Sequence, residues 1–460
     1  MIKYYGRKKA NTMEDTIVAI SSSAGAGAIS IIRLSGSDAL NIASKVFTKD
    51  LTEVDTHTIH YGYIKDGEEK IDEVLVSVMK SPKTFTREDI VEINCHGGLA
   101  TTNKVLEILL ENGARLAEPG EFTKRAFLNG RIDLLEAEAT MDLISSRAES
   151  TRKISINTLT GETSNLIKDL RKELVQIISN IEVNIDYPEY EDIEVLTNNS
   201  ILPSVKKFKE KLEDIIQKSE DSKIIKEGIK VGIIGKPNVG KSSLLNSLLE
   251  EEKAIVTDIP GTTRDIVEGS LVLGGIPLNI IDTAGIRKTE DTVEKIGVEK
   301  SLSIIDTADL IIYILNNNEE ITEEEKELLN KIKDKKKIIV VNKIDLETRL
   351  DKKILDSYIE ISVKENIGVN KIKEEIKRLF SIGDIITNDV TYLSNARSIA
   401  LLKKSLKSIN EAEEEITINS PIDIVELSLK DAWSSLGEII GETYTEELLD
   451  ELFSRFCLGK

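Results

Sequence analysis

The chain has 460 residues, with 61 Lys or Arg against 81 Asp or Glu, so its formal net charge is −20. This length allows two or three domains with sizeable cores. The negative charge excludes nucleic-acid binding by overall electrostatic attraction, so any RNA contact requires a local basic patch or a partner. The two cysteines exclude a disulfide framework and favour a reducing cytoplasm, and no apolar run reaches membrane-spanning length.

The N-terminal part has a mixed pattern. Met1 to Asn11 is basic but precedes no hydrophobic region, so we do not expect a signal peptide, and Met13 is an alternative start. From Asp15 to Glu118, short β-like runs alternate with Gly-rich turns and helical stretches such as Lys104–Glu111, which predicts an α+β domain. The β-like runs are Thr16–Ile20, Ala28–Leu34, Val74–Met79 and Ile90–Asn94.

The pattern becomes helical from Pro119. Apolar residues recur at helical spacing from Leu170 to Ile185, where Tyr187-Pro188 interrupts them, and the spacing returns from Ile399 to Ile440. We expect these two helical stretches to pack on one another, with the intervening α/β segment inserted as a module. The predicted boundaries are 1–118 for the N-terminal domain, 119–216 and 381–460 for the two helical parts, and 217–380 for the inserted domain.

A phosphate-binding loop is predicted directly after the apolar run Ile229–Ile234. Residues Gly235 to Ser242 read Gly-Lys-Pro-Asn-Val-Gly-Lys-Ser, which fits G-x-x-x-x-G-K-[ST]. In such loops backbone N–H groups surround the phosphates, Lys241 reaches the β- and γ-phosphates, and the Ser242 hydroxyl ligands Mg²⁺. The motif alone is a hypothesis, since a long chain can match it by chance.

Four further elements follow in the order that a GTPase requires. Two are predicted switches, where Thr262-Thr263 completes the magnesium shell and Asp282 after a buried strand delivers a carboxylate to the metal. A third motif, Asn342 to Asp345, is typical of guanine recognition, and Ser362 to Lys364 closes the base pocket. The predicted GTP-binding residues are Asn238, Val239, Gly240, Lys241, Ser242, Ser243, Thr257, Asp258, Ile259, Pro260, Gly261, Thr262, Thr263, Asp282, Thr283, Ala284, Gly285, Asn342, Lys343, Ile344, Asp345, Ser362, Val363 and Lys364.

The residue after Gly285, the glycine of the second predicted switch, differs from the one found in many small GTPases. Those proteins place Gln there to orient the attacking water, whereas this chain has Ile286. Glu294, in the same segment, is our candidate for orienting the water. Asn238 in the phosphate loop can help to ligand a monovalent cation, which would supply the positive charge that an arginine finger supplies elsewhere.

Two other charged features have simpler interpretations. The acidic run Glu319 to Glu327 is expected to be a solvated helix face. His96 lies beside two glycines and is expected to belong to a structural turn, because three His and two Cys do not form a metal-ligand cluster in the sequence.

Beyond these motifs, the chain resembles the tRNA modification GTPase family MnmE, also called TrmE. The opening from Asp15 to Gly36, with Arg33-Leu34-Ser35-Gly36, is similar to that of the family. So are Glu92 to Gly98, Pro119 to Arg131 and the ending Phe456 to Lys460. One departure is Ser22-Ser23-Ala24, where the family often has Thr-Pro-Pro, and the resemblance spans essentially the whole chain.

The resemblance implies an N-terminal α+β folate-binding domain that pairs two subunits, a central helical domain, and an inserted Ras-like α/β P-loop GTPase domain. It also implies a cytoplasmic enzyme that hydrolyses GTP. With the FAD-dependent protein MnmG, in a heterotetramer, it would place an aminomethyl or carboxymethylaminomethyl group on C5 of the wobble uridine of certain tRNAs. The one-carbon donor would be 5-formyl- or 5,10-methylene-tetrahydrofolate.

Site residues follow by position from the same resemblance. Arg33, Glu92, Arg131 and Lys460 match the folate-contacting residues. A K⁺ site matches Asn238, the carbonyls of Thr257 and Ile259, and Thr262; the Mg²⁺ ligands match Ser242 and Thr263. Glu294 matches the water-orienting acid, and Cys457 the cysteine of the C-terminal motif. Without the resemblance, Arg33 and Glu92 would be interpreted as a surface ion pair and Cys457 as a frayed terminal thiol.

Two alternatives remain at this stage. An Era-like ribosome-assembly GTPase would share the Pro-Asn-x-Gly-Lys-Ser loop but would need neither the tail cysteine nor the N-terminal signatures, and a basic RNA-binding domain is missing. A dimeric scaffold with degenerate nucleotide binding would not need intact Lys241, Asp282 and Asp345.

Overall fold

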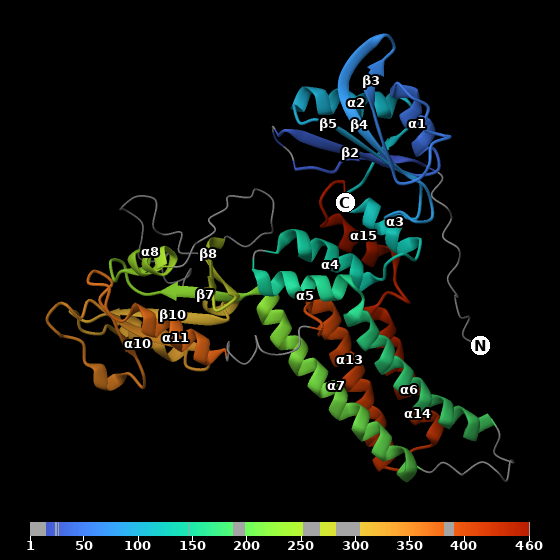
Figure 1. Cartoon of the computed structure of the whole chain (residues 1–460). Coiled ribbons are helices and arrows are strands. Elements are labelled where there is room, and N and C mark those ends of the chain that lie inside the picture. The colour runs from blue at the N-terminus through green and yellow to red at the C-terminus, as the bar shows by residue number, and fades with distance from the viewer. Residues whose placement is uncertain are drawn as a thin grey trace. The chain divides into compact units, whose positions relative to one another are not determined.

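The computed structural model describes residues 15–23, 25, 27–146, 148–186, 198–251, 267–281, 304–380 and 391–459 (Figure 1). It divides into two compact units. Unit 1 comprises residues 1–141, 167–171 and 433–460, and unit 2 comprises residues 142–166 and 172–432. None of the helices in the described ranges is both long and apolar enough to cross a membrane.

Unit 1 contains a six-stranded mixed sheet in the order β3-β4-β5-β2-β1-β6. Neighbouring strands are antiparallel, except that β1 and β6 are parallel. The strands are β1 (Ile17–Ile20), β2 (Ile29–Ser35), β3 (Thr58–Asp66), β4 (Glu69–Met79), β5 (Ile90–His96) and β6 (Arg115–Leu116). Helices α1 (Ala39–Val46) and α2 (Leu99–Glu111) contribute apolar side chains to the buried core of this sheet. The predicted α+β pattern is confirmed, although the sequence did not indicate β3.

Helices at both ends of the chain complete unit 1. α3 (Glu121–Leu128) packs against α15 (Glu446–Ser454), and their contact is an apolar cluster that includes Phe127, Phe453 and Phe456. Gly120 precedes α3 with a φ of +69°, and a Cβ there would lie 2.7 Å from the Phe453 carbonyl oxygen. Only glycine therefore allows the chain to turn into α3 this close to α15.

Long helices of unit 2 carry the apolar stripes read from the sequence. The stripe in α13 (Ala396–Thr417) is buried at Ile399, Leu402 and Ile409, and α13 packs on α7 (Asn198–Glu227). Because α7 follows the Leu170–Ile185 stretch, this contact does not test the expected packing of the two predicted stretches on one another, which stays a prediction. The polar stretch that begins at Gln217 is the last part of α7. Its buried positions include the small polar residues Ser219 and Ser222. Other helices that lie wholly or partly in this unit are α4 (Leu134–Ser145), α5 (Glu149–Leu159), α6 (Glu162–Asp186) and α14 (Ile422–Ile439).

A second six-stranded sheet, in the order β12-β11-β10-β7-β9-β8, also belongs to unit 2. Its strands are parallel apart from β8, which pairs antiparallel with β9. They are β7 (Ile229–Ile234), β8 (Val267–Leu273), β9 (Ile276–Ile281), β10 (Leu310–Asn316), β11 (Lys337–Asn342) and β12 (Ile359–Glu360). Helices α8 (Lys241–Glu251), α10 (Glu323–Lys331) and α11 (Val369–Leu379), with the 3₁₀ turn Lys352–Ile354, accompany the sheet. This confirms the predicted α/β module.

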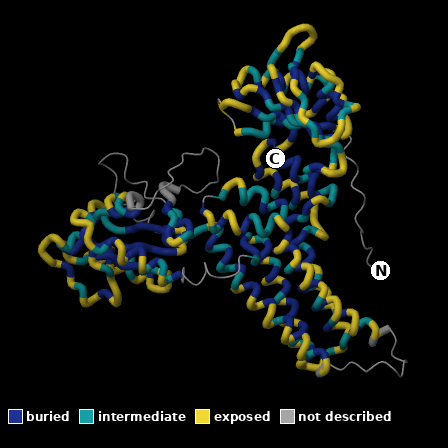
Figure 2. The backbone as a smooth tube through the Cα atoms, viewed as in Figure 1, coloured by how far each residue is buried: buried dark blue, intermediate teal, exposed yellow. Residues whose placement is uncertain are grey.

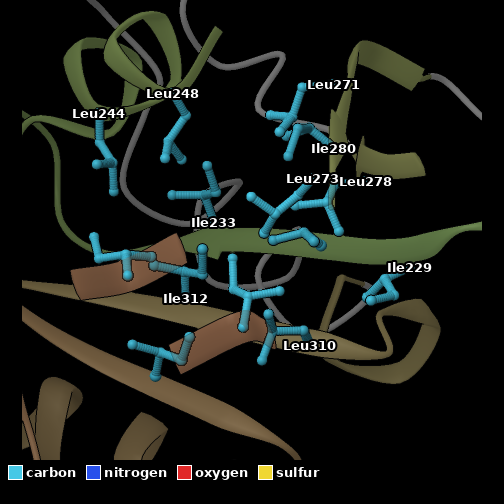
Figure 3. Close-up of a cluster of buried hydrophobic side chains, with 14 of the residues drawn as sticks. Ile229, Ile233, Leu244, Leu248, Leu271, Leu273, Leu278, Ile280, Leu310 and Ile312 are labelled. Carbon is cyan, nitrogen blue, oxygen red and sulfur yellow. The ribbon is translucent and has the colours of Figure 1, made fainter. Parts of the chain in front are cut away.

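The second sheet is buried on both faces, as nearly continuous apolar runs in parallel strands predict. All seven residues of β10 are buried, and Figure 2 shows the dark blue strands enclosed by more exposed helices. On one face, Ile233, Leu244 and Ile312 converge in an aliphatic cluster (Figure 3). This cluster holds α8 against β7, so the loop that joins them is fixed at both ends.

Candidate functional site

The loop between β7 and α8 adopts a conformation that its glycines make possible. Gly235 has a φ of +149°, Asn238 of +61° and Gly240 of +101°. A Cβ on Gly240 would lie 2.4 Å from Asn342 Nδ2, a separation that side chains do not tolerate. The loop therefore forms a close cradle of backbone atoms, as the G-x-x-x-x-G-K-[ST] motif predicts.

Lys241 lies at the start of α8 with its side chain turned back over the loop. Its Nζ donates to the carbonyl oxygens of Gly235 at 2.6 Å and Lys236 at 2.8 Å. Burial lowers the pKa of this lysine from its ordinary value, because a low-dielectric surrounding disfavours the charged form. Ser242 and Ser243 follow in the first turn of α8, where free backbone N–H groups and the helix dipole favour anions.

A second loop, which follows β11, reaches the phosphate loop through Asn342. The Asn342 side chain is buried; its Nδ2 donates to the Val239 carbonyl at 2.8 Å, and its Oδ1 accepts from the Val363 N–H at 3.2 Å. One amide thus joins the phosphate loop to both predicted base-reading segments. The carboxyl ends of parallel β7, β11 and β12 bring these segments to one edge of the sheet, where open α/β sheets bind their ligands.

Asp345 presents a charged acceptor at the same edge. Ser362 Oγ donates to Asp345 Oδ1 at 2.7 Å, and this hydrogen bond holds the pKa of the carboxyl below its usual value. Lys343 takes a positive φ of 64°, which turns the chain between Asn342 and Asp345. An ionised carboxylate accepts hydrogen bonds only, which suits the N1–H and amino group of guanine.

An ion pair that the sequence did not indicate joins the phosphate loop to α10. Lys236 Nζ lies 2.9 Å from Glu325 Oε2, and Glu325 is buried. The same carboxylate accepts from the Thr322 N–H at 2.8 Å. The expectation of a wholly solvated acidic face is therefore wrong for Glu325; the Thr-x-x-Glu capping-box pattern before α10 was the available signal.

Three predicted folate residues lie in unit 1: Arg33 on β2, Glu92 on β5, and Arg131 shortly after α3. Arg33 and Glu92 face one another in the β2–β5 register, with Arg33 Nε and Nη2 each 2.7 Å from Glu92 Oε1. The Arg33 guanidinium lies over the Phe122 ring, 5.7 Å from its centroid. Arg131 lies over Phe85 at 4.9 Å, and Phe85 packs against the small cluster that contains Phe122.

The C-terminal segment also belongs to this part of unit 1. Cys457 is exposed and is a free thiol, and the Gly459 carbonyl accepts from Arg33 Nη1 at 3.4 Å. Figure 1 marks the C-terminus beside α3 and α15. Arg33, Glu92 and the Cys457 segment are therefore neighbours, as expected of a tail that folds back on the N-terminal sheet.

His96 and Asp72 form a pair away from these contacts. Asp72 Oδ1 lies 2.7 Å from His96 Nδ1, and Asp72 Oδ2 accepts from the His96 N–H at 2.8 Å. The hydrogen bond and charge of Asp72 raise the pKa of His96 above its ordinary value. The residues of the described ranges include no group of three or more His, Cys, Asp or Glu that could hold a metal ion.

Several predicted site residues lie outside the described residues. They are Thr257, Asp258, Ile259, Pro260, Gly261, Thr262, Thr263, Asp282, Thr283, Ala284, Gly285, Glu294 and Lys460. Of the predicted metal ligands, the structure places Asn238 and Ser242.

Comparison with known proteins identifies the family. The model described as "GTP-binding protein TrmE N-terminus" matches residues 16–131, and "MnmE helical domain" matches residues 134–457. A tRNA modification GTPase MnmE from Enterococcus faecalis is 50% identical over 461 residues, covering 98% of this chain and 99% of the relative. The chain belongs to the tRNA modification GTPase MnmE family.

Another MnmE relative, from Listeria welshimeri, is 51% identical over 454 residues, covering 97% of this chain and 99% of its own length. Full-length identity at this level favours the tRNA modification family over an Era-like assembly factor. Among solved structures, the G domain of the T. maritima FeoB iron transporter is 27% identical and covers 33% of this chain and 98% of that one. The TM-score of this match is 0.25.

Proposed function

We propose that this chain is a cytoplasmic, K⁺-activated GTPase that works as a homodimer with the FAD-dependent protein MnmG on tRNA. Together they install an aminomethyl or carboxymethylaminomethyl group at C5 of the wobble uridine, with a tetrahydrofolate derivative as one-carbon donor. The observation that carries the nucleotide part is the Asn342 amide, which joins the phosphate loop to the base-reading segments. We also infer the domain boundaries 1–118, 119–216, 217–380 and 381–460.

The described residues fit a magnesium nucleotide. The close cradle at Gly240, the Lys241 ammonium and the start of α8 supply N–H donors and positive charge for phosphates, and Ser242 supplies a hydroxyl ligand. Mg²⁺ would neutralise charge on the β- and γ-phosphates when bound. Thr263 and Asp282 are proposed to complete the metal site, and Asp345 with Ser362 to read guanine.

Potassium activation is proposed from Asn238 together with Ile286, which cannot orient water. Asn238 is the non-glycine residue of this loop that takes a positive φ, and the proposed cation shell adds Thr257, Ile259 and Thr262. GTP turnover should be measured in potassium and sodium salts at equal ionic strength. We expect clearly faster hydrolysis in potassium, since the smaller sodium ion fits such a shell poorly; equal rates would refute the activation.

Glu294 is the proposed water-orienting acid. Glu294→Ala should leave nucleotide affinity nearly intact but slow turnover by more than about tenfold, which corresponds to about 1.4 kcal/mol of transition-state stabilisation. Steady-state and single-turnover hydrolysis, with fluorescent-nucleotide binding, separate the two effects. Glu327→Ala, on the exposed face of α10, is the control and should behave as the parent chain. A Glu294 variant that hydrolyses normally would remove this residue from the mechanism.

The folate assignment has support from the chemistry of the donor set. Arg33 uses only Oε1 of Glu92, so Oε2 can accept hydrogen bonds from the ring N–H and amino group of a pterin. Arg131 and Lys460 would supply positive charge for the glutamate carboxylates. Calorimetry with 5-formyl-tetrahydrofolate should show a loss of affinity of at least about tenfold for Glu92→Gln, because a charged acceptor becomes neutral. Unchanged binding would place the folate elsewhere.

The modification itself is tested by mass spectrometry of wobble nucleosides from cells with and without this chain. We propose that Cys457 serves the modification chemistry and not GTP hydrolysis. Cys457→Ser should keep K⁺-stimulated hydrolysis but lose wobble-uridine modification. Normal modified-nucleoside levels would show that the thiol is dispensable, and a collapse of hydrolysis would point to a structural role.

A further inference from the structure

The segment that carries Cys457 is attached to unit 1 at two points. The first point is the Phe456 side chain together with the Cys457 carbonyl. The Phe456 side chain is buried against α3, where a Cβ on Gly120 would lie 2.8 Å from Phe456 Cβ, and the Gly120 N–H donates to the Cys457 carbonyl at 3.3 Å. Both the residue before Cys457 and the Cys457 carbonyl are thus held against the start of α3.

The second point is the Gly459 carbonyl. It accepts from Ser21 Oγ at 3.1 Å and from Arg33 Nη1 at 3.4 Å. Gly459 has a φ of +84°, and a Cβ there would lie 2.4 Å from the Ile20 carbonyl oxygen. The tail therefore lies directly on the end of β1, with a backbone conformation that favours glycine.

Ser21 is itself held rigidly. Its N–H donates to the Ile31 carbonyl at 2.8 Å, which continues the pairing of β1 with β2 by one residue. The hydroxyl thus projects from the sheet, while Arg33 on β2 shares its guanidinium between Glu92 and the tail. The exposed Cys457 belongs to the first attachment point and precedes the second by two residues, so the Ser21 hydroxyl contributes to the placement of its thiol.

We propose that Ser21 is a positioning residue for Cys457: its hydroxyl, with Arg33, holds the Gly459 carbonyl and so keeps the thiol beside the Arg33–Glu92 pair. This rests on the proposed function of Cys457. Ser21 stands immediately before Ser22-Ser23-Ala24, so the segment that departs from the family pattern begins next to the contact with the tail. Without the Ser21 hydroxyl, the Gly459 carbonyl would keep only the longer contact with Arg33 Nη1.

The test compares Ser21→Ala, Ser21→Thr and the control Ser23→Ala, whose side chain is exposed two residues away. The first readout is hydrogen exchange of the Gly120 amide, which is protected only while the tail is docked. Exchange should be about fivefold faster in Ser21→Ala, within the range for loss of one hydrogen bond, and close to that of the parent chain in the other two. Exchange of the Ser21 amide monitors the integrity of the sheet.

The second readout is wobble-uridine modification with the full chain, its partner and tRNA. Ser21→Ala should reduce the rate constant about fivefold at saturating folate, and Ser21→Thr, which keeps the hydroxyl, should restore it. Normal Gly120 exchange and normal modification in Ser21→Ala would overturn the proposal. If Cys457→Ser modifies tRNA normally while Ser21→Ala still releases the tail, the proposed role of the thiol fails and the anchor stands. A threonine variant that behaves like alanine would overturn the role of the hydroxyl.

Discussion

At the scale of single residues, hydrogen bonds favour the charged form of two side chains, Asp345 and His96. The Ser362 hydroxyl donates a hydrogen bond to Asp345, and Asp72 contacts both the ring and the backbone N–H of His96. In both cases a hydrogen bond favours the charged form of the titrating group. The charge of Asp345 bears on the proposed recognition of guanine, and the charge of His96 bears on the pH dependence of the stability of unit 1.

Asp345→Asn should change base preference. The amide turns one acceptor into a donor and leaves the N1–H of guanine unpaired, at a cost of about 1–3 kcal/mol or more. GTP should bind more weakly and xanthosine triphosphate more tightly, as measured by competition with a fluorescent nucleotide. Asp351→Asn, at the N-cap of the 3₁₀ turn Lys352–Ile354, is a control that should retain the preference for GTP.

The pKa values of His96 and His60 should be shifted in opposite directions from 6.5. Asp72 raises the pKa of His96, whereas burial and the nearby Lys49 lower that of His60. Because the folded pKa of His96 is raised, its pair stabilises the fold fully below pH 6.5, and the contribution is lost as the pH rises through the higher folded value. NMR titration should show this order, and Asp72→Asn should move His96 back towards 6.5 without moving His60. The same value for both rings would refute the pairing.

At the scale of elements, glycines determine where a loop can pass close to its neighbours. Gly240 combines a positive φ with a near contact to the Asn342 amide, whereas Gly113 has a φ of +111° with no atom within 4 Å of a built Cβ. Both glycines have a positive φ, but only at Gly240 would a Cβ meet a neighbouring atom. Comparing the two positions therefore separates the cost of the backbone conformation from the cost of the steric clash.

Gly240→Ala should abolish measurable nucleotide binding by the phosphate loop, because the new methyl group displaces Asn342 and with it the link between the two loops. Gly113→Ala should cost only the strain of its φ, about 1–2 kcal/mol of unfolding free energy, and leave nucleotide affinity unchanged. Nucleotide titration and urea denaturation measure both quantities. If Gly240→Ala binds GTP like Gly113→Ala, the close contact is not essential.

Elements were predictable where one periodicity dominated. Apolar spacing predicted α6, α13 and α14, and glycine motifs after apolar runs predicted the loops after β7 and β11. β3 was missed because it lies at the sheet edge and exposes Ile59 and Tyr61, which blurs its alternation. The pairing of Lys236 with Glu325 and of Ser21 with Gly459 joins residues far apart in the sequence, and one sequence has no local signal for such contacts.

At the scale of the whole molecule, unit 1 is assembled from distant parts of the chain, and a buried arginine joins several of them. Arg125 in α3 is 1% exposed and reaches Asp15 before β1, Glu88 before β5 and Glu121. Burial would raise the pKa of Glu121, but hydrogen bonds from Arg115, the Glu118 N–H and Arg125 hold it below its usual value. Ion pairs of a buried arginine therefore contribute to the contact between α3 and the segments next to the sheet.

Arg125→Met should lower the unfolding free energy of unit 1 by about 3–5 kcal/mol, since three carboxylates lose a buried partner. Arg152→Met removes an exposed pair with Glu149 and should change stability by less than about 1 kcal/mol. Urea denaturation followed through unit 1 compares them. The parent chain should also lose the stabilisation from Glu121 as the pH falls below 4.5 through the lowered folded pKa. Equal effects of the two substitutions would show that the network is dispensable.

The aliphatic cluster under the phosphate loop gives the protein a built-in spectroscopic reporter. Val239 belongs to both the loop and the cluster, where Ile233, Leu244 and Ile312 surround the same interior. Selective ¹³C-methyl labelling of Ile, Leu and Val should therefore allow nucleotide occupancy to be followed from inside the unaltered chain.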